Sequence, residues 1–201
     1  MAATGFIGAV YVFAHMLGNL QVFAGPKRLN AYAAFLKSND EVLWSARIIL
    51  MAAVIIHIVA SYQLARASQK SRPIKYDRWR PIASTFASRT MRWSGPILGI
   101  FIIYHLLHLT TGSVHPDFRL GDVYHNVITG FRVWYVSAFY VVAMGALGLH
   151  LYHGGWSMFQ SVGLNHAKYN RSIRTAITLF TIIVTIGFAS IPVAVLFGVI
   201  K

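Results

Sequence analysis

Four histidines are the residues of this chain with the clearest chemical potential, because each lies inside a different long apolar stretch. They are His15, His57, His105 and His150. A neutral imidazole at membrane depth is costly unless it has a partner. Four imidazoles on four helices indicate shared ligands in the interior of a bundle. Two b-type haems, each with two axial histidines, would use all four, and we predict these four side chains as the ligands of the haem iron.

The composition is that of an integral membrane protein. Of the 201 residues, 56% are hydrophobic and only 11% are charged. The chain has no cysteine, which excludes a covalently attached c-type haem and an iron–sulfur cluster ligated by this chain. The basic residues that give the formal charge of +13 lie between the apolar stretches and do not form one soluble face. It therefore favours membrane orientation and contact with anionic lipid, and nucleic acid is not expected as a partner.

Five apolar stretches each approach or exceed the ~20 residues that a helix needs to cross the hydrocarbon layer. They are Phe6 to Phe23, Leu43 to Ala65, Ser94 to Thr111, Val133 to Gly154 and Ile173 to Val199. Gly25-Pro26 predicts the end of the first helix, Gly95-Pro96 the start of the third, and Pro192 a kink in the fifth unless that helix ends early. We expect an all-α fold, a five-helix membrane bundle that forms one transmembrane domain over residues 1–201.

Basic residues in the connections predict the orientation, because Lys and Arg accumulate on the cytoplasmic side. Residues 66–92 hold eight of them, and Lys168, Arg171 and Arg174 bring the side shared with the N-terminus to eleven. The opposite side has seven. We therefore expect the N-terminus in the cytoplasm and the protein in the cell inner or plasma membrane.

Helical rise assigns a depth to each histidine. At ~1.5 Å per residue, His15 and His105 lie about 14 and 16 Å from the inner boundary. By the same rise, His57 and His150 lie about 21 and 25 Å from the outer boundary of a ~30 Å core. Matching depths predict an inner haem between His57 and His150 and an outer haem between His15 and His105. Two stacked haems would form an electron path through the membrane.

Two further histidines leave an alternative open. His108 follows His105 by three residues and His153 follows His150 by three, so either member of each pair could be the ligand. We prefer the first of each. His153 could then bond a haem propionate or a lipid headgroup, and His108 could lie near a bound quinone.

Four sequence segments together resemble a known family of membrane proteins. They are Ala14-His15-Met-Leu-Gly18-Asn19, His57 forty-two residues after His15, Arg92-Trp93-Ser94-Gly95 thirteen residues before His105, and His150-Leu-Tyr-His153-Gly-Gly-Trp156-Ser-Met-Phe159. Over nearly the whole chain, this pattern is similar to the cytochrome b membrane-anchor subunit of succinate dehydrogenases and fumarate reductases, in its single-chain, five-helix, two-haem form.

The resemblance implies a membrane anchor for a flavoprotein subunit and an iron–sulfur subunit. It implies electron transfer from succinate to a membrane quinone, menaquinone in this subtype, with succinate oxidation on the partner subunits. Carried over to this chain, it implies the same four ligands in the same two pairs. Two other functions stay open from the residues alone: the cytochrome anchor of a hydrogenase or formate dehydrogenase, and a histidine-dependent metal or proton transporter.

Candidate contacts for the haem propionates lie where the third helix begins, because an arginine fork can bind both oxygens of a carboxylate. They are Ser88, Arg89 and Arg92, with Thr90 beside them and His153 on the fourth helix. Arg47 and Arg132 have weaker claims on the other side. Candidates for the quinone region are Trp93, His108, Asp40 and Glu41, since quinone reduction consumes protons near the surface. For His115, His125 and His166 we expect surface positions without a function.

Overall fold

The chain folds into helices throughout the part that the computed structural model describes, residues 1–71 and 84–201. In chain order they are α1 (Ala2–Asn19), the 3₁₀ turn η1 (Leu20–Ala24), α2 (Pro26–Lys37), α3 (Asp40–Lys70), α4 (Phe86–His105), the π turn η2 (Leu106–Thr110), α5 (Val123–Arg132), α6 (Trp134–Ser161) and α7 (Ala167–Leu196). Five of the helical stretches are long and apolar enough to cross a membrane. The predicted all-α bundle with five spans is confirmed.

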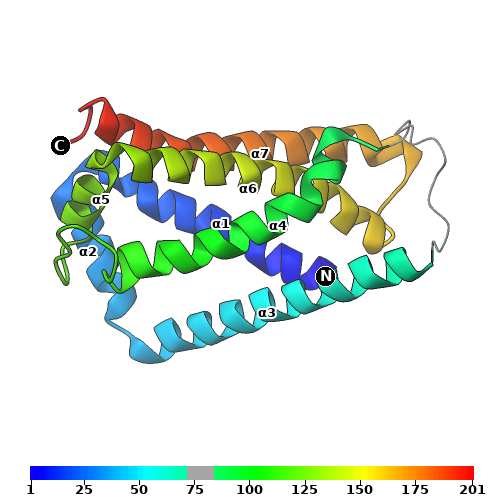
Figure 1. Cartoon of the computed structure of the whole chain (residues 1–201), viewed down its shortest axis with the longest axis horizontal. Coiled ribbons are helices and arrows are strands. Elements are labelled where there is room, and N and C mark those ends of the chain that lie inside the picture. Colours follow the sequence, from blue (N-terminus) through cyan, green and yellow to red (C-terminus); the bar gives the residue numbers. More distant parts are fainter. Residues whose placement is uncertain (72–83) are drawn as a thin grey trace.

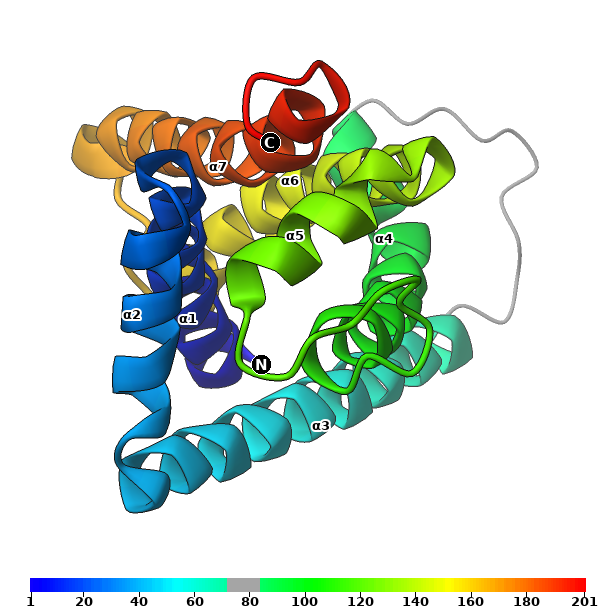
Figure 2. The same cartoon turned by 90° about the vertical axis from the view of Figure 1, so that its left-hand side faces the viewer.

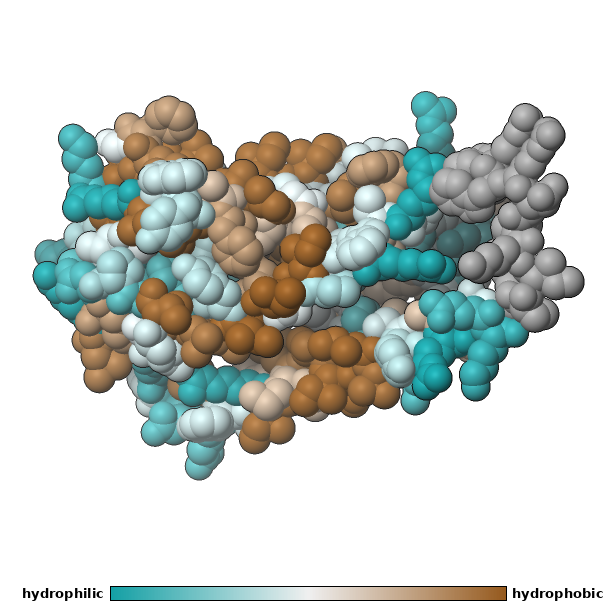
Figure 3. Space-filling view, viewed as in Figure 1, coloured by the Kyte–Doolittle hydropathy of each residue, from teal (hydrophilic) through white to brown (hydrophobic). Residues whose placement is uncertain are grey.

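The five long helices run along one axis, and their connections gather at two ends (Figure 1). One end, here called the N-terminal end, carries the start of the chain, the end of α3 and the turn between α6 and α7. The other, the C-terminal end, carries α2, α5 and the chain terminus. Hydrophobic residues cover much of the middle of the molecule and hydrophilic ones gather toward the ends (Figure 3). The distribution is that of a multi-pass membrane protein.

The start of the third span differs from the prediction. Helix α4 begins at Phe86, because the Thr85 side chain accepts a hydrogen bond from the backbone N–H of Ser88 (3.2 Å) and caps the helix there. Pro96 lies inside α4 and does not open it. Proline is tolerated inside a membrane helix because neighbouring groups can satisfy the carbonyl that loses its partner. The predicted stop at Gly25-Pro26 is confirmed: Gly25 has a φ of +89° and Pro26 begins α2.

Two other predicted spans are shorter than the helices that the structure shows. Helix α3 extends from Asp40 to Lys70, with Asn39 as its cap, and α6 continues through Gly154 and Gly155. A Cβ at Gly155 would lie 3.0 Å from the Ile177 side chain, so the glycine allows α7 to pack closely there. Helix α7 continues past Pro192, while its end at Leu196 comes three residues before the predicted one.

Two short helices that the hydropathy pattern does not predict close the C-terminal end. Viewed from that end, α5 and α2 both lie across the bundle axis, with α2 in front of α1 (Figure 2). They are joined by Asn30, whose amide donates to Asp122 (2.9 Å) and accepts from the backbone N–H of Tyr124 (2.9 Å). The largest buried hydrophobic cluster lies here, with members from η1, α2, α5, α6 and α7.

Helix α3 is the least enclosed of the long helices. Its most apolar segment is only 6% buried within the chain, against 33% for the corresponding segments of α6 and α7. Among the described residues, its close packing partners are α1 and α2. Figure 2 shows it along one edge of the bundle. Contacts with other elements of this chain therefore hold α3 weakly.

Candidate functional site: two histidine pairs

The structure brings the four predicted ligands together in two pairs. The imidazole centroids of His57 and His150 lie 6.1 Å apart, and those of His15 and His105 lie 5.9 Å apart. These are the pairs that depth predicts. A nitrogen bound to a transition metal lies ~2.0–2.1 Å from it, so two imidazoles on opposite sides of one ion have centroids roughly 6 Å apart. Both separations fit one iron between two rings.

The helices that share a pair do not pack directly on each other. Along the described chain, neither α1 with α4 nor α3 with α6 belongs to the closely packed helix pairs, whereas α6 packs against α1, α4 and α7. The paired side chains instead approach each other across the space between their helices. Each pair is therefore formed by side chains from two helices that are not in close contact.

Hydroxyl groups lie beside three of the four rings, in each case at Nδ1. The pairs are Thr4 Oγ1 with His57 (3.1 Å), Ser94 Oγ with His150 (3.4 Å) and Tyr140 Oη with His105 (3.4 Å). A ligating histidine usually donates its other ring N–H to such a partner, which fixes its tautomer and orientation. The hydroxyls therefore leave Nε2 as the nitrogen available for iron.

Each of three helices presents a ligand at one level and a hydroxyl at the other. On α1, Thr4 and His15 are eleven residues apart, and on α4 so are Ser94 and His105. At 1.5 Å per residue this spacing is about 16 Å, and the ten residues between Tyr140 and His150 on α6 span about 15 Å. The two histidine pairs therefore lie roughly 16 Å apart along the bundle axis.

His15 has a different environment. Asn19, one turn later, donates to the His15 carbonyl (2.7 Å), and its amide nitrogen lies 3.3 Å from both ring nitrogens. Tyr11 stacks on the imidazole with ring centroids 5.3 Å apart, and Phe188 lies 5.8 Å away. The ring is thus oriented by aromatic packing from both its own helix and α7.

The alternative ligands lie elsewhere. His108 is fully buried, with Nδ1 3.0 Å from Tyr140 Oη, and its ring stacks on His115 with centroids 4.9 Å apart. His153 has Nε2 3.2 Å from Ser157 Oγ on the same helix. Neither forms a ring pair with a histidine of another long helix among the described contacts. The geometry therefore favours His105 and His150, and ligation itself stays a prediction.

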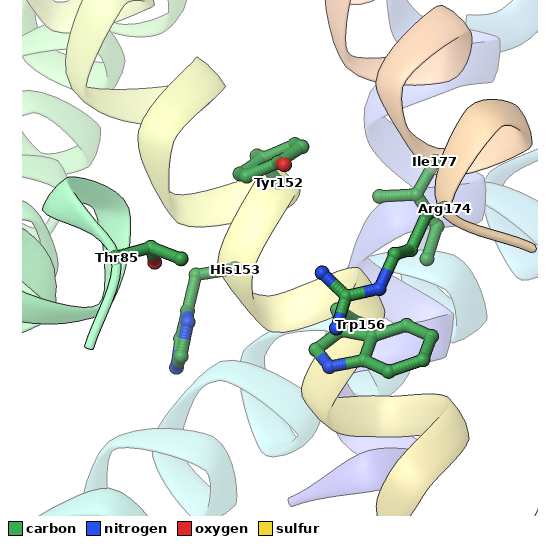
Figure 4. Close-up of a pocket in the computed structure, with 6 residues that line it drawn as sticks. All are labelled: Thr85, Tyr152, His153, Trp156, Arg174 and Ile177. Carbon is green, nitrogen blue, oxygen red and sulfur yellow. The ribbon is translucent and has the colours of Figure 1, made fainter. Parts of the chain in front are cut away.

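A small cavity at the N-terminal end involves residues that the sequence did not single out as a group. It has a volume of about 30 Å³ and is lined by Thr85, Tyr152, His153, Trp156, Arg174 and Ile177. The Arg174 guanidinium carbon lies 3.9 Å from the Trp156 ring centroid, a cation–π contact between α7 and α6 (Figure 4). In the sequence, Trp156 belongs to the segment that carries the family resemblance and Arg174 to the basic residues that predict orientation, and no local signal joins two residues from separate helices.

The predicted propionate contacts are less enclosed. Ser88 donates its hydroxyl to the Thr85 carbonyl (2.8 Å), and Arg89 and Arg92 have exposed side chains. Arg47 and Arg132 are also exposed, toward the C-terminal end. Of the predicted set, His153 lines the cavity described above. Arg72, Lys75, Arg78 and Arg80, which belong to the basic residues that predict the orientation, lie outside the described residues.

The four quinone candidates do not come together in one site. Trp93 is 73% exposed and lies fifteen residues before His108 on the same helical stretch, about 22 Å along the axis. Asp40 and Glu41 are exposed in the first turn of α3, at the C-terminal end. The end of the bundle that holds Asp40 and Glu41 is also the end nearer to His15, His105 and His108.

The loop before α5 is more structured than the sequence predicts. His115 Nε2–H donates to the Asn126 carbonyl (2.8 Å), while His115 Nδ1 accepts from the Asp117 backbone N–H (3.0 Å). His125 Nε2 lies 2.8 Å from a carboxylate oxygen of Asp117. His115 and His125 are therefore partly buried and have structural hydrogen bonds that the sequence did not predict. His166 also has a structural position, because its Nδ1 accepts from the Lys168 N–H and caps α7.

Asp122 caps α5 in the same region. Its carboxylate accepts from the His125 backbone N–H (3.0 Å) and from the Asn30 amide, and these hydrogen bonds, in that order, hold the Asp122 pKa below its usual value. A hydrogen bond to the charged form of a carboxyl favours that form. The cap therefore stabilises α5 as an ionised group.

Comparison with known proteins gives one family. The family model described as the succinate dehydrogenase/fumarate reductase transmembrane subunit matches residues 68–189. The matched region runs from the end of α3 into α7 and includes His105 and His150. Searches of curated proteins and of solved structures found no match.

Proposed function

This chain belongs to the family of succinate dehydrogenase/fumarate reductase transmembrane subunits, and from that premise we propose a di-haem electron carrier. In this proposal it anchors a flavoprotein subunit and an iron–sulfur subunit to the membrane. It then passes electrons between the iron–sulfur subunit and a quinone, with menaquinone as the proposed substrate. Succinate oxidation takes place on the partner subunits.

The single observation that carries the proposal is the pairing of four imidazoles at two levels. Each pair has a centroid separation that suits one iron, and the two helices of each pair leave room between their backbones. A haem b held by two histidines has no open coordination position, so it supplies one-electron transfer and does not bind oxygen. His57 with His150 and His15 with His105 would hold the two groups.

Hydroxyl groups beside three of the four ligands favour one tautomer of each imidazole. Thr4, Ser94 and Tyr140 each place a hydroxyl oxygen within hydrogen-bond distance of Nδ1 of a ligand, an arrangement that would hold the proton on Nδ1 and leave Nε2 to bind iron. Holding the proton there avoids a competing tautomer at the metal. The two pairs lie roughly 16 Å apart along the bundle axis, so electrons would pass from one bound haem to the next.

We place the iron–sulfur subunit at the N-terminal end, on the cytoplasmic side, because the basic residues concentrate there. The quinone region is then proposed at the C-terminal end, nearer to His15 and His105. Asp40 and Glu41 lie at that end with exposed carboxylates, where a group that exchanges protons with quinone is needed. Exposed basic side chains such as Arg89 and Arg92 suit contacts with anionic lipid headgroups.

The experiment is purification of the intact complex through a tag on this chain, followed by a reduced-minus-oxidised visible spectrum. We expect b-type absorption with two haems per chain, co-purified flavin and iron–sulfur subunits, and succinate-dependent reduction of a menaquinone analogue. A ubiquinone analogue is the matched control for the quinone type. A colourless, folded complex would overturn the haem assignment, and a coloured complex without a flavin subunit would overturn the assembly.

A further inference from the structure

A hydrogen-bonded chain of three side chains leads from one predicted haem ligand into the core of the C-terminal end. Tyr140 Oη lies 3.4 Å from His105 Nδ1 and 3.0 Å from His108 Nδ1. Tyr140 is 5% exposed and His108 is completely buried. One phenol on α6 therefore links the ligand on α4 to a histidine in the π turn that follows it.

The direction of each proton in this chain follows from ligation. If Nε2 of His105 faces iron, its Nδ1 carries the proton and donates to Tyr140 Oη. The single phenol proton then goes to His108, whose Nδ1 accepts it. His108 consequently carries its own proton on Nε2. If His108 Nδ1 carried a proton instead, the Tyr140 oxygen would accept from both imidazoles and neither ring would accept the phenol proton.

Packing holds His108 in place at its other end. Its Nε2 is buried and has no hydrogen-bond partner among the described residues. Burying an unpaired polar nitrogen costs stability, and an apolar residue in the same position would avoid that cost. The ring stacks on Tyr104 and His115, with centroids 5.5 and 4.9 Å away. A Cβ at Gly130 would lie 2.8 Å from His108 Nε2. Only glycine therefore allows α5 to close over this imidazole.

The backbone of this segment is also unusual. Helix α4 changes to a π turn immediately after His105, and His108 lies within that turn. Single π turns are rare in helices overall, and those that do occur are often found at functional sites. Across this turn, both imidazoles lie within hydrogen-bond distance of Tyr140 Oη, while His105 also faces the His15 ring and His108 stacks on His115.

We propose that Tyr140 and His108 are positioning residues that set the reduction potential of the haem between His15 and His105. The proposal rests on the proposed di-haem function. Tyr140 accepts the Nδ1–H of His105, which makes the ligand more basic and stabilises oxidised iron. His108 accepts the Tyr140 proton, which makes the phenol oxygen a better acceptor. Together they lower the potential of this haem.

The test is redox titration of both haems in the purified complex, with electron paramagnetic resonance spectra to separate them. For Tyr140→Phe we expect the haem at the α1/α4 pair to shift upward by an amount equivalent to about tenfold in its reduced-to-oxidised ratio, or 59 mV. The other haem should not move. Ser94→Ala is the matched control, because that hydroxyl contacts His150 at the same 3.4 Å and should shift only the other haem.

Two substitutions of His108 make the test independent of Tyr140. His108→Leu removes the acceptor and should raise the same potential by a smaller amount, while His108→Gln retains a carbonyl acceptor and should restore most of it. If His108 acted only through packing, both variants would shift the potential by the same amount. That result would overturn the role of His108 as a hydrogen-bond acceptor. Unchanged potential and spectrum in Tyr140→Phe, with both haems bound, would overturn the whole inference. A complex that binds no haem in its unsubstituted form contradicts the proposed function instead.

Discussion

The two histidine pairs have similar chemistry but different surroundings. His105 lies among Phe101, Tyr140 and the His15 ring, beside the largest hydrophobic cluster and beneath α5. His57 lies on α3, whose close neighbours among the described residues are α1 and α2, and its hydroxyl partner is Thr4 near the start of the chain. The α1/α4 pair is thus enclosed by protein, while the α3/α6 pair lies between a well-packed helix and a weakly held one.

This difference separates two ways of building a ligand pair. At the α1/α4 pair, direct packing of α1 and α4 on α6 sets the distance between the rings. At the α3/α6 pair, α1 is the shared neighbour of both helices, but α3 is otherwise packed only against α2 among the described residues and is 6% buried, so a group bound between His57 and His150 would add a further link between α3 and the bundle. Haem is therefore expected to be a cofactor at one level and also a structural element at the other.

The largest effect is expected from removing ligands. His57→Ala and His105→Ala should each lose one of the two haems and retain the other. Because a haem bound at His57 would also hold α3, we expect His57→Ala to expose α3 to proteolysis and hydrogen exchange, and His105→Ala to leave α3 protected. Haem content and exchange by mass spectrometry check both. Equal protection of α3 in the two variants would remove the distinction between the pairs, and unchanged haem content after substitution of all four histidines would remove the ligand assignment.

Closing of α5 over the α1/α4 pair can be tested at Gly130. The Cβ of Gly130→Ala would lie 2.8 Å from His108 and 2.9 Å from His115, so overpacking should destabilise the complex by about 1–3 kcal/mol. Gly145→Ala is the control, since no atom lies within 4 Å of its Cβ and alanine improves helix propensity by up to about 1 kcal/mol. Thermal unfolding in detergent measures both. Equal stability of the two variants would contradict the close packing at Gly130.

A smaller effect is expected at Thr4. Thr4→Val removes the hydroxyl that lies 3.1 Å from His57 Nδ1 and should raise the potential of the α3/α6 haem by no more than about tenfold in its reduced-to-oxidised ratio. The haem of the α1/α4 pair should keep its potential. Thr4→Ser retains the hydroxyl and should behave like the unsubstituted chain in redox titration. A shift of both haems would show that Thr4 acts through the fold and not through His57.

The smallest effect is expected at Asp122. Asp122→Ala removes the cap of α5 and should cost about 1 kcal/mol of stability. Hydrogen bonds lower the Asp122 pKa in the folded state, so its contribution is present above the unfolded pKa of about 3.9 and is lost as pH falls through the folded value. Asp122→Asn retains a capping oxygen, so its deficit relative to the unsubstituted chain should shrink in this acidic range. A deficit that does not change with pH would exclude the ionised cap.

Much of the fold was accessible from the sequence because it depends on local properties. Apolar stretches long enough to cross a membrane predict five spans, and Gly25-Pro26 predicts where the first one stops. Caps and tertiary contacts moved the other boundaries: Thr85 starts α4 before Pro96, and Ile177 packs where α6 continues through Gly155. Helices α2 and α5 are too short and too polar for a hydropathy pattern, and they form through contacts such as Asn30 with Asp122.

For the candidate site, too, some features could be predicted from the sequence and others could not. The preference for His105 over His108 and for His150 over His153 agrees with the geometry, although the residues alone left both open. The role of Tyr140 was not predicted, because nothing near it in the sequence distinguishes it from an ordinary aromatic core residue. The hydrogen bond of His115 to α5 was not predicted, because the loop that carries it folds back on α5 and no local signal in His115-Pro116-Asp117 indicates that contact.

The sequence by itself determined the number of apolar spans and which histidines lie at the same level along the bundle. These follow from the constant rise of a helix and from the length of each apolar stretch, which are properties of the local chain. Only the tertiary structure decided which ring nitrogen has a hydroxyl behind it and which histidine is buried in the core. Those depend on how each helix is rotated about its axis and on which helix lies beside it, and packing between distant segments sets both.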